Sequence, residues 1–190
     1  MSMNCLLHSC CGPCAVKCVE ELQTERVRLS LFWYNPNIHP VTEYLSRREA
    51  FIQYAQSTEL PYILKDEYGL RAFVSGVSPD FDKRCEFCYN IRLDAAAAYA
   101  AANGFDNFST TLLISPWQNH DMIRAAAEEI SQRRRIPFFY RDFRPLFREG
   151  QQSARDMGLY MQKYCGCIFS EEERYQKKIL HLFSERDKIT

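Results

Sequence analysis

Cysteine is the residue type whose number and spacing in this chain most clearly predict chemistry. Seven of the nine cysteines fall into three tight groups that lie far apart in the sequence. The groups are Cys10, Cys11 and Cys14 in SCCGPC, Cys85 and Cys88 in RCEFC, and Cys165 and Cys167 in YCGC. Scattered core cysteines would not pair up at spacings of one to three residues. The pattern therefore predicts a metal or redox site that folding assembles from three segments.

The first two groups supply enough sulfur for a metal centre. Cys85 and Cys88 have the C-x-x-C spacing that lets both thiolates converge on one metal or cluster. Together with Cys10 and Cys11 they make four thiolates, which suits either a structural zinc ion or a four-iron cluster. Zinc sites usually use two C-x-x-C knuckles, so the adjacent Cys-Cys pair favours iron and sulfur.

The third group has two interpretations. A disulfide between Cys165 and Cys167 would be strained and easily reduced, because only one residue separates them. Such a bond is typical of an electron shuttle. Alternatively, both thiols are further metal ligands. The remaining two, Cys5 and Cys18, are expected to be small core residues.

Two other hypotheses use fewer of the cysteines. The tetrapeptide CGPC also forms the active site of thioredoxins, so a dithiol/disulfide oxidoreductase that depends on Cys11 and Cys14 is one alternative. It leaves the two downstream groups unexplained. A zinc-stabilised domain that binds nucleic acid or protein through its basic helices is the other alternative.

Composition is that of an ordinary globular protein. The 190 residues are 46% hydrophobic and 25% charged, and they hold no apolar run long enough for a membrane helix. The opening residues do not resemble a secretory signal, so we expect a cytoplasmic protein whose thiols stay reduced. Basic and acidic residues are equal at 24 each, so no overall field attracts nucleic acid, and any such binding must come from local basic patches.

Strand and helix patterns alternate along nearly the whole chain. Expected strands cover residues 3–9, 27–34, 61–67, 107–115 and 136–143; expected helices cover 15–25, 42–57, 88–104, 122–134 and the segment from about 151. Residues 69–83 are expected to form a loop. The alternation predicts a single α/β domain over residues 1–190, with a parallel sheet in the order 3-2-1-4-5, helices on both faces and a helical C-terminal segment. Ligands of such sheets bind beyond the carboxyl ends of the strands, where SCCGPC is expected.

Five motifs in sequence order resemble the QueH-type epoxyqueuosine reductases. They are LLHSCCGPC, FWYNPNIHPVTEYLSRR, RCEFCYNIRL, FSTTLLISP and YCGC, which together span Met3 to about Cys167. The resemblance implies the last step of queuosine biosynthesis: the two-electron removal of the epoxide oxygen of epoxyqueuosine at the wobble position of tRNA. It also implies an adenine nucleotide hydrolase-like (Rossmann-like) fold. Cysteines and a proline occupy the place of that fold's phosphate loop, which argues against ATP binding.

The resemblance also implies roles for the cysteines. Cys10, Cys11, Cys85 and Cys88 would bind a 4Fe-4S cluster, and Cys165 and Cys167 would be the redox-active pair. A second, non-cluster metal ion, iron in our interpretation, would lie beside the cluster with Cys14 as a ligand. The tRNA partner and an unidentified electron donor follow from the implied reaction.

Opening an epoxide reductively needs an acid on the departing oxygen and a nearby electron source. Our candidates for the acid are His39, Asp80 and Tyr34, although a loop histidine, a loop-capping aspartate and a half-buried aromatic would fit the same positions. Arg47 and Arg48 are predicted to contact tRNA phosphates, and Tyr34 to stack on an unpaired base.

Overall fold

Four strands form one parallel sheet in the computed structural model, which describes residues 3–186; the ends of the predicted domain, residues 1–2 and 187–190, lie outside the described residues. Their spatial order is β3-β2-β1-β4. The strands are β1 (Asn4–His8), β2 (Arg28–Trp33), β3 (Tyr62–Leu64) and β4 (Asn107–Thr110). Leu7 of the central strand pairs with Leu31 of β2, and His8 pairs with Thr110 of β4. The predicted parallel sheet and the order of its first four strands are confirmed.

The predicted fifth strand over 136–143 is wrong. This segment makes only an isolated parallel bridge from Phe138 to Phe108 of β4. The backbone N–H of Phe108 donates to the carbonyl of Pro137 (3.0 Å), and Phe139 donates back to Phe108 (2.8 Å). Pro137 has no N–H to donate, so the ladder cannot extend from this bridge toward the start of the segment.

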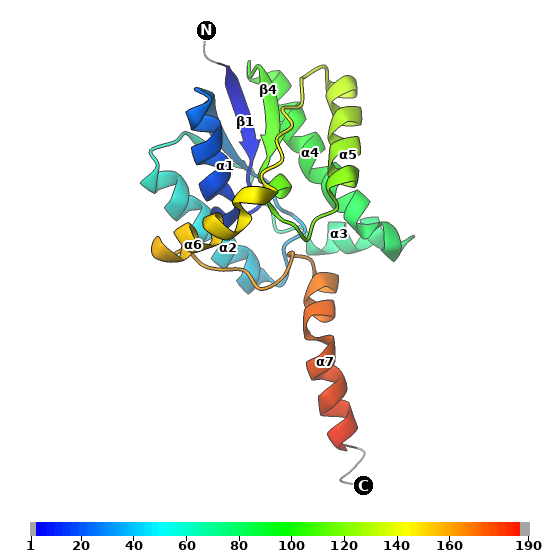
Figure 1. The fold of residues 1–190 in the computed structure, drawn as a ribbon. Coiled ribbons are helices and arrows are strands. Elements are labelled where there is room, and N and C mark those ends of the chain that lie inside the picture. Colours follow the sequence, from blue (N-terminus) through cyan, green and yellow to red (C-terminus); the bar gives the residue numbers. More distant parts are fainter. Residues whose placement is uncertain (1–2, 187–190) are drawn as a thin grey trace.

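Helices cover both faces of the sheet, as predicted (Figure 1). They are α1 (Gly12–Thr24), α2 (Val41–Ser57), α3 (Leu70–Val77), α4 (Arg84–Ala102), α5 (His120–Arg134), α6 (Phe147–Asp156) and α7 (Ile168–Arg186). Helices α1, α2 and α6 lie on one side, and α4 and α5 lie on the other. The alanine-rich stretch of α4 allows close approach to the sheet: Ala96, Ala97 and Ala100 are fully buried.

The loop predicted over 69–83 is also wrong in part, because Leu70–Val77 is helical and Phe81–Lys83 is a short 3₁₀ helix. Glycines obscured the helical spacing of this segment. Phe73 and Val77, which face the same side of α3, are buried at 1% exposure. A side chain at Gly76 would collide with the ring of Phe87, so the glycine lets α3 pack closely on α4.

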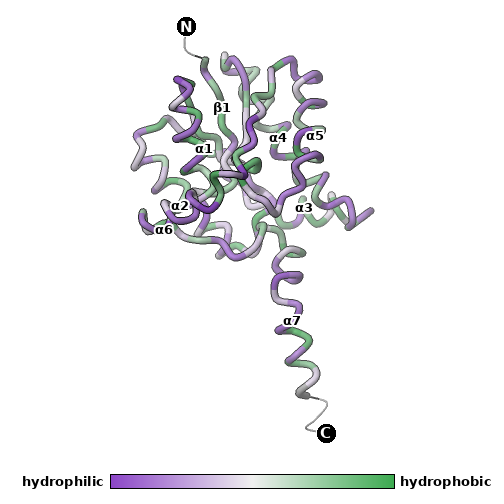
Figure 2. The backbone as a smooth tube through the Cα atoms, in the orientation of Figure 1, coloured by the Kyte–Doolittle hydropathy of each residue, from purple (hydrophilic) through white to green (hydrophobic). Residues whose placement is uncertain are grey.

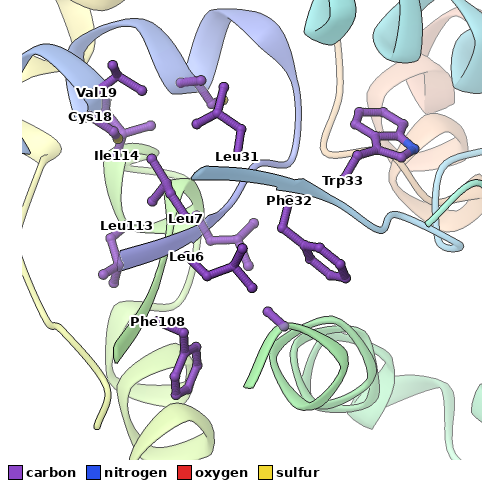
Figure 3. Packing of buried hydrophobic residues seen from close by; sticks show 14 of the residues in the cluster. Leu6, Leu7, Cys18, Val19, Leu31, Phe32, Trp33, Phe108, Leu113 and Ile114 are labelled. Atoms are coloured by element: carbon purple, nitrogen blue, oxygen red, sulfur yellow. The ribbon is translucent and has the colours of Figure 1, made fainter. Parts of the chain in front are cut away.

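The core is built on the alternation of side chains along the central strands. Leu7 and Leu31 point to the face covered by α1, where Val19 packs, whereas Leu6 and Phe32 point to the opposite face (Figure 3). All five side chains are at most 1% exposed. This two-sided burial explains why the strands have nearly continuous apolar runs.

The strands β1 and β4 point toward the end of the domain from which α7 projects (Figure 1). Hydrophilic and hydrophobic residues alternate along α7, and Leu180 and Leu182 are exposed (Figure 2). Among residues 3–186, no helix is both long enough and apolar enough to cross a membrane. Because β1 and β4 point toward the end from which α7 projects, their carboxyl ends face the segment before α7, which carries the third cysteine group.

Candidate metal and redox site

The first cysteine group is held where β1 turns into α1. Cys11 is the N-cap residue of α1 in an extended conformation, and Pro13 starts the helix where no backbone donor is needed. The sulfurs of Cys10, Cys11 and Cys14 all lie within 4.8 Å of one another. A side chain at Gly12 would come to 2.5 Å from the carbonyl oxygen of Ala50 in α2, so only glycine fits between the helices. The sequence thus positions three thiols at one point.

These three thiols share negative charge unequally. The pKa of Cys10 is lowered well below its ordinary value, because its thiolate accepts hydrogen bonds from Cys11 and then from Cys14. Burial raises the pKa of Cys11, and the hydrogen bond with Cys10 is the largest contribution to the raised pKa of Cys14. The group therefore carries one negative charge readily and further charges only with a cation beside it. This donor set fits a thiophilic metal ion or cluster.

The second and third groups lie together. Cys88 in α4 and Cys167 are both buried and pack in a small cluster with Phe73 and Val77. Burial raises the pKa of Cys88 to about 12, and the nearby charge of Cys165 contributes in the same direction. Folding therefore brings the Cys85–Cys88 pair next to the Cys165–Cys167 pair, while the three sulfurs of the SCCGPC segment form a group of their own.

Arg92 connects the groups electrostatically. It is 2% exposed, and its Nη2 donates a hydrogen bond to the sulfur of Cys88 (3.1 Å). Burial acts to lower the pKa of Arg92, but the charges of Cys88, Cys165 and Cys10 outweigh it and raise the pKa. A buried guanidinium is stable only beside compensating negative charge. Arg92 is thus placed to compensate thiolates from all three groups.

Neutral side chains complete the environment of the sulfurs. Gln162 donates from Nε2 to the sulfur of Cys11 (3.0 Å), Gln118 donates to the sulfur of Cys165 (3.0 Å), and Thr111 donates to that of Cys10 (3.3 Å). Sequence reasoning missed these residues. Arg92 had a usable signal, since it lies one helical turn after Cys88; the two glutamines and the threonine had none.

Arg47 holds the segment that carries the third cysteine group. Its Nε donates to Glu43 (2.6 Å), while Nη1 and Nη2 donate to the carbonyls of Cys165 (2.9 Å) and Tyr164 (2.8 Å). Arg47 is only 2% exposed. This does not fit the predicted phosphate contact, because a buried guanidinium engaged by three protein acceptors cannot reach a phosphate without losing them. The structure gives it a role in fixing the loop.

Gly166, between the two cysteines of the third group, has φ of +143°, which favours glycine. A side chain there would lie within 3.4 Å of Asn37, Ile38 and Arg47. The N–H of His39 donates to the carbonyl of Gly166 (2.8 Å), and the hydroxyl of Tyr164 donates to the carbonyl of His39 (2.6 Å). The loop is therefore clamped against the segment after β2.

The three candidate acids lie in different environments. The His39 ring is fully buried against Phe73, and burial lowers its pKa to about 4, so it is neutral at pH 7. Tyr34 is half-buried, with the ammonium of Lys65 3.9 Å from the centre of its ring, and burial raises its pKa. Asp80 is exposed and caps the 3₁₀ helix by accepting from a backbone N–H, the structural alternative considered above.

Two further residues, Arg48 and His8, lie near the carboxyl ends of the strands in different environments. Arg48 is partly exposed and pairs with Asp66 (2.5 Å), so it remains accessible at the surface. His8, which sequence reasoning did not single out, is fully buried at the end of β1. Its ring nitrogens lie 2.9 Å from the hydroxyl of Thr110 and 3.2 Å from the carbonyl of Tyr34. His8 thereby joins three strand ends directly before the first cysteine group.

Relatives of this chain share one description. The family profile described as "Epoxyqueuosine reductase QueH" matches residues 5–173. A QueH epoxyqueuosine reductase of Dehalococcoides mccartyi is 36% identical over 93% of this chain and 97% of its own length. Those of Acinetobacter baylyi and Thermotoga maritima are 38% and 35% identical, over 87% and 90% of this chain and 79% and 92% of their own lengths.

Similarity to solved structures is weaker. A deacetylase–teicoplanin complex from the teicoplanin biosynthesis pathway covers 82% of this chain and 86% of its own, with 13% identity and a TM-score of 0.46. A score of this size does not establish a shared fold. The family match, by contrast, spans all three cysteine groups. The family predicted from the five motifs is confirmed: this chain belongs to the QueH epoxyqueuosine reductases.

Proposed function

We propose that this protein reduces epoxyqueuosine to queuosine at the wobble position of tRNA. The observation that carries the proposal is the placement of Arg92, whose buried charge is within electrostatic reach of cysteines from all three groups. Family membership supports the reaction, since the relatives are named for it. It also argues against a dithiol oxidoreductase of the thioredoxin type, which has no use for three groups.

The cysteines divide into ligands and a redox pair in this proposal. Cys10, Cys11, Cys85 and Cys88 would hold a 4Fe-4S cluster, and Cys14 would bind a second metal ion beside it. When bound, the metals supply one-electron transfer and an electron-poor site for the epoxide oxygen. The three clustered thiols support this assignment, because uncompensated thiolates packed this closely repel one another. Arg92 relates the two pairs, since it donates to the sulfur of Cys88 and is influenced by the charge of Cys10.

The Cys165–Cys167 pair supplies the electrons, and the reaction balances with it. Loss of the epoxide oxygen as water consumes two electrons and two protons, and oxidation of two thiols to a disulfide releases the same number. The products are queuosine, water and a disulfide, which an external electron donor must reduce again. The clamp of Arg47 and Gly166 on this loop supports the role, since it fixes the pair beside Cys88.

The proton donor remains one of the three candidates. Tyr34 retains an ionisable hydroxyl and is half-buried beyond β2, whereas His39 is neutral and enclosed, and Asp80 already caps a helix. Arg48 is the proposed phosphate contact, because it keeps part of its guanidinium at the surface. The strand order supports the adenine nucleotide hydrolase-like fold that we propose for this single domain, and the cytoplasm remains its proposed location.

The proposal is tested by anaerobic purification with quantitation of iron, acid-labile sulfide and zinc, followed by turnover of epoxyqueuosine-containing tRNA. Cys88→Ala is expected to lose cluster iron and turnover together. Cys5→Ala, which changes a buried cysteine of β1 outside the site, keeps both. Retention of iron with full activity in Cys88→Ala overturns the ligand assignment. Colourless wild-type protein with one bound zinc ion and no turnover supports the zinc-stabilised binding domain instead.

A further inference from the structure

Trp117 is the most exposed large hydrophobic side chain among the described residues, at 86%. The other tryptophan of the chain, Trp33, is fully buried in the core. Trp117 lies in the short connection between the 3₁₀ helix after β4 (Thr111–Ile114) and α5. Exposure of an indole to this extent leaves both of its apolar faces in water and open to contact.

The loop around Trp117 is well fixed. The N–H of Trp117 donates to the hydroxyl of Ser115 (3.3 Å), and the N–H of Gln118 donates to the carbonyl of Ser115 (3.3 Å). Asn119 caps α5 by accepting from the N–H of Met122 (3.0 Å). These contacts fix the backbone of the loop on either side of Trp117.

The same loop touches the site. The Nε2 of Gln118 donates to the sulfur of Cys165 (3.0 Å), and the Oε1 of Gln118 accepts from the hydroxyl of Tyr89 (2.6 Å). Tyr89 directly follows Cys88 in α4. Consecutive Cα atoms are about 3.8 Å apart, so Trp117 lies one residue from Gln118, whose side chain donates a hydrogen bond to the proposed redox pair.

We propose that Trp117 is the platform on which an unpaired base of the tRNA anticodon loop stacks. The inference rests on the proposed function: a substrate nucleotide in a loop enters together with unpaired neighbours, and stacking on aromatic rings is how such bases are held. Tyr34, the platform predicted from the sequence, is a poorer fit, because Lys65 already covers its ring at 3.9 Å. Trp117 has an exposed ring, and the residue after it contacts Cys165.

Intrinsic fluorescence tests the proposal directly. Excitation of both tryptophans while an anticodon stem-loop RNA carrying epoxyqueuosine is added should give saturable quenching of the solvent-exposed emission, with the buried Trp33 as a constant background. An RNA duplex of the stem alone should give no quenching. Variants that lack the reporting indole are compared by the anisotropy of a fluorescently labelled stem-loop RNA. Because stacking contributes about 1–3 kcal/mol per base, Trp117→Ala should bind the loop about 5- to 150-fold more weakly.

Trp117→Phe is the matched control, since it keeps an aromatic face and should retain most of the affinity. Iron content of all variants should equal that of the wild type. Turnover of the modified tRNA without any quenching, or equal affinity of Trp117→Ala and wild type, overturns the role of Trp117 and leaves the proposed reaction standing. Absence of both RNA binding and turnover overturns the two together.

Discussion

At the scale of single residues, the site is defined by charge compensation. Arg47 and Arg92 are each 2% exposed, and both are influenced by thiols: Arg47 by Cys11 and Cys165, Arg92 by Cys88. Glu43 already compensates Arg47, whereas no carboxylate pairs with Arg92 among the described residues, so its buried charge is unfavourable beside neutral thiols. The charge of Arg92 is well matched to thiolates that would bind metal. The spacing of the cysteines predicts the site from the sequence alone. The role of these arginines could be recognised only in the folded structure.

If the proposed 4Fe-4S cluster is reconstituted, Arg92→Gln should lower its midpoint reduction potential. The substitution removes a positive charge and the hydrogen bond to the sulfur of Cys88, and both losses disfavour an added electron. A redox titration followed by electron paramagnetic resonance measures the shift. Arg92→Lys keeps the charge and should shift the potential less. Identical potentials in the wild type and Arg92→Gln would contradict the role of Arg92.

The buried ring of His39 should make stability depend on pH. Its pKa is lowered by burial to about 4 in the folded protein, against an ordinary value near 6.5. The unfolded chain therefore binds the proton more tightly, and the stability that His39 contributes is present above pH 6.5 and is lost as the pH falls toward 4. The expected slope from this residue is about 1.4 kcal/mol per pH unit in that window.

Chemical denaturation of His39→Gln and wild type at several pH values between 7.5 and 4.5 measures this contribution. The variant should be less stable near neutral pH, because a buried ring is replaced, but its stability should decline less steeply on acidification. Parallel curves for the two proteins would show that His39 is protonated equally in the folded and unfolded states.

At the scale of elements, the sequence predicts what is decided locally. Strands β2 and β4 lie within the predicted ranges 27–34 and 107–115. Their apolar runs are typical of strands that are buried on both faces of a sheet. The segment 136–143 begins with an apolar run as well, yet it makes one bridge, and Pro137 lacks the donor that would extend the ladder toward residue 106. The helix Leu70–Val77 could not be predicted because Gly76 interrupts its apolar spacing. This glycine allows close packing against α4, which only the structure shows.

Gly166→Ala should damage the third cysteine group without unfolding the sheet. The new Cβ would lie within 3.4 Å of Arg47 and Asn37, and alanine strongly disfavours a φ of +143°. We expect a loss of about 1–3 kcal/mol in the free energy of unfolding, and turnover reduced more than cluster content. Gly104→Ala is the control, because Gly104 also has positive φ (+72°) with nothing within 4 Å of its added carbon.

Equal effects of Gly166→Ala and Gly104→Ala on turnover would show that backbone strain alone, and not the clamp on the Cys165–Cys167 loop, accounts for the result. Denaturant midpoints, iron content and turnover of the two variants make the comparison. The change in turnover relative to iron content is the decisive quantity.

At the scale of the whole molecule, the chain order of the cysteines becomes meaningful through the sheet. The first group follows β1 at the centre of the sheet, the second opens α4, and the third precedes α7, all toward the end of the domain from which α7 projects (Figure 1). Parallel strands require their carboxyl ends to share one edge, so the placement of SCCGPC beyond β1 could be predicted. The adjacency of Cys88 and Cys167 could not, since it depends on how α3 and the loop before α7 pack.

Removal of the proposed metal centre should therefore loosen the periphery and leave the sheet intact. Cys85 and Cys165 are exposed and lie on segments outside the main core, whereas β1 and β2 are buried without help from any ligand. Binding to the folded state stabilises the elements that supply ligands. Hydrogen exchange measured before and after anaerobic chelation should show faster exchange in residues 81–90 and 160–169 and unchanged protection in residues 4–8 and 28–33. Acceleration across all four segments would mean that the metal stabilises the whole fold. The hydrophobic core that includes Leu6, Leu7 and Phe32 would then be insufficient to keep the domain folded.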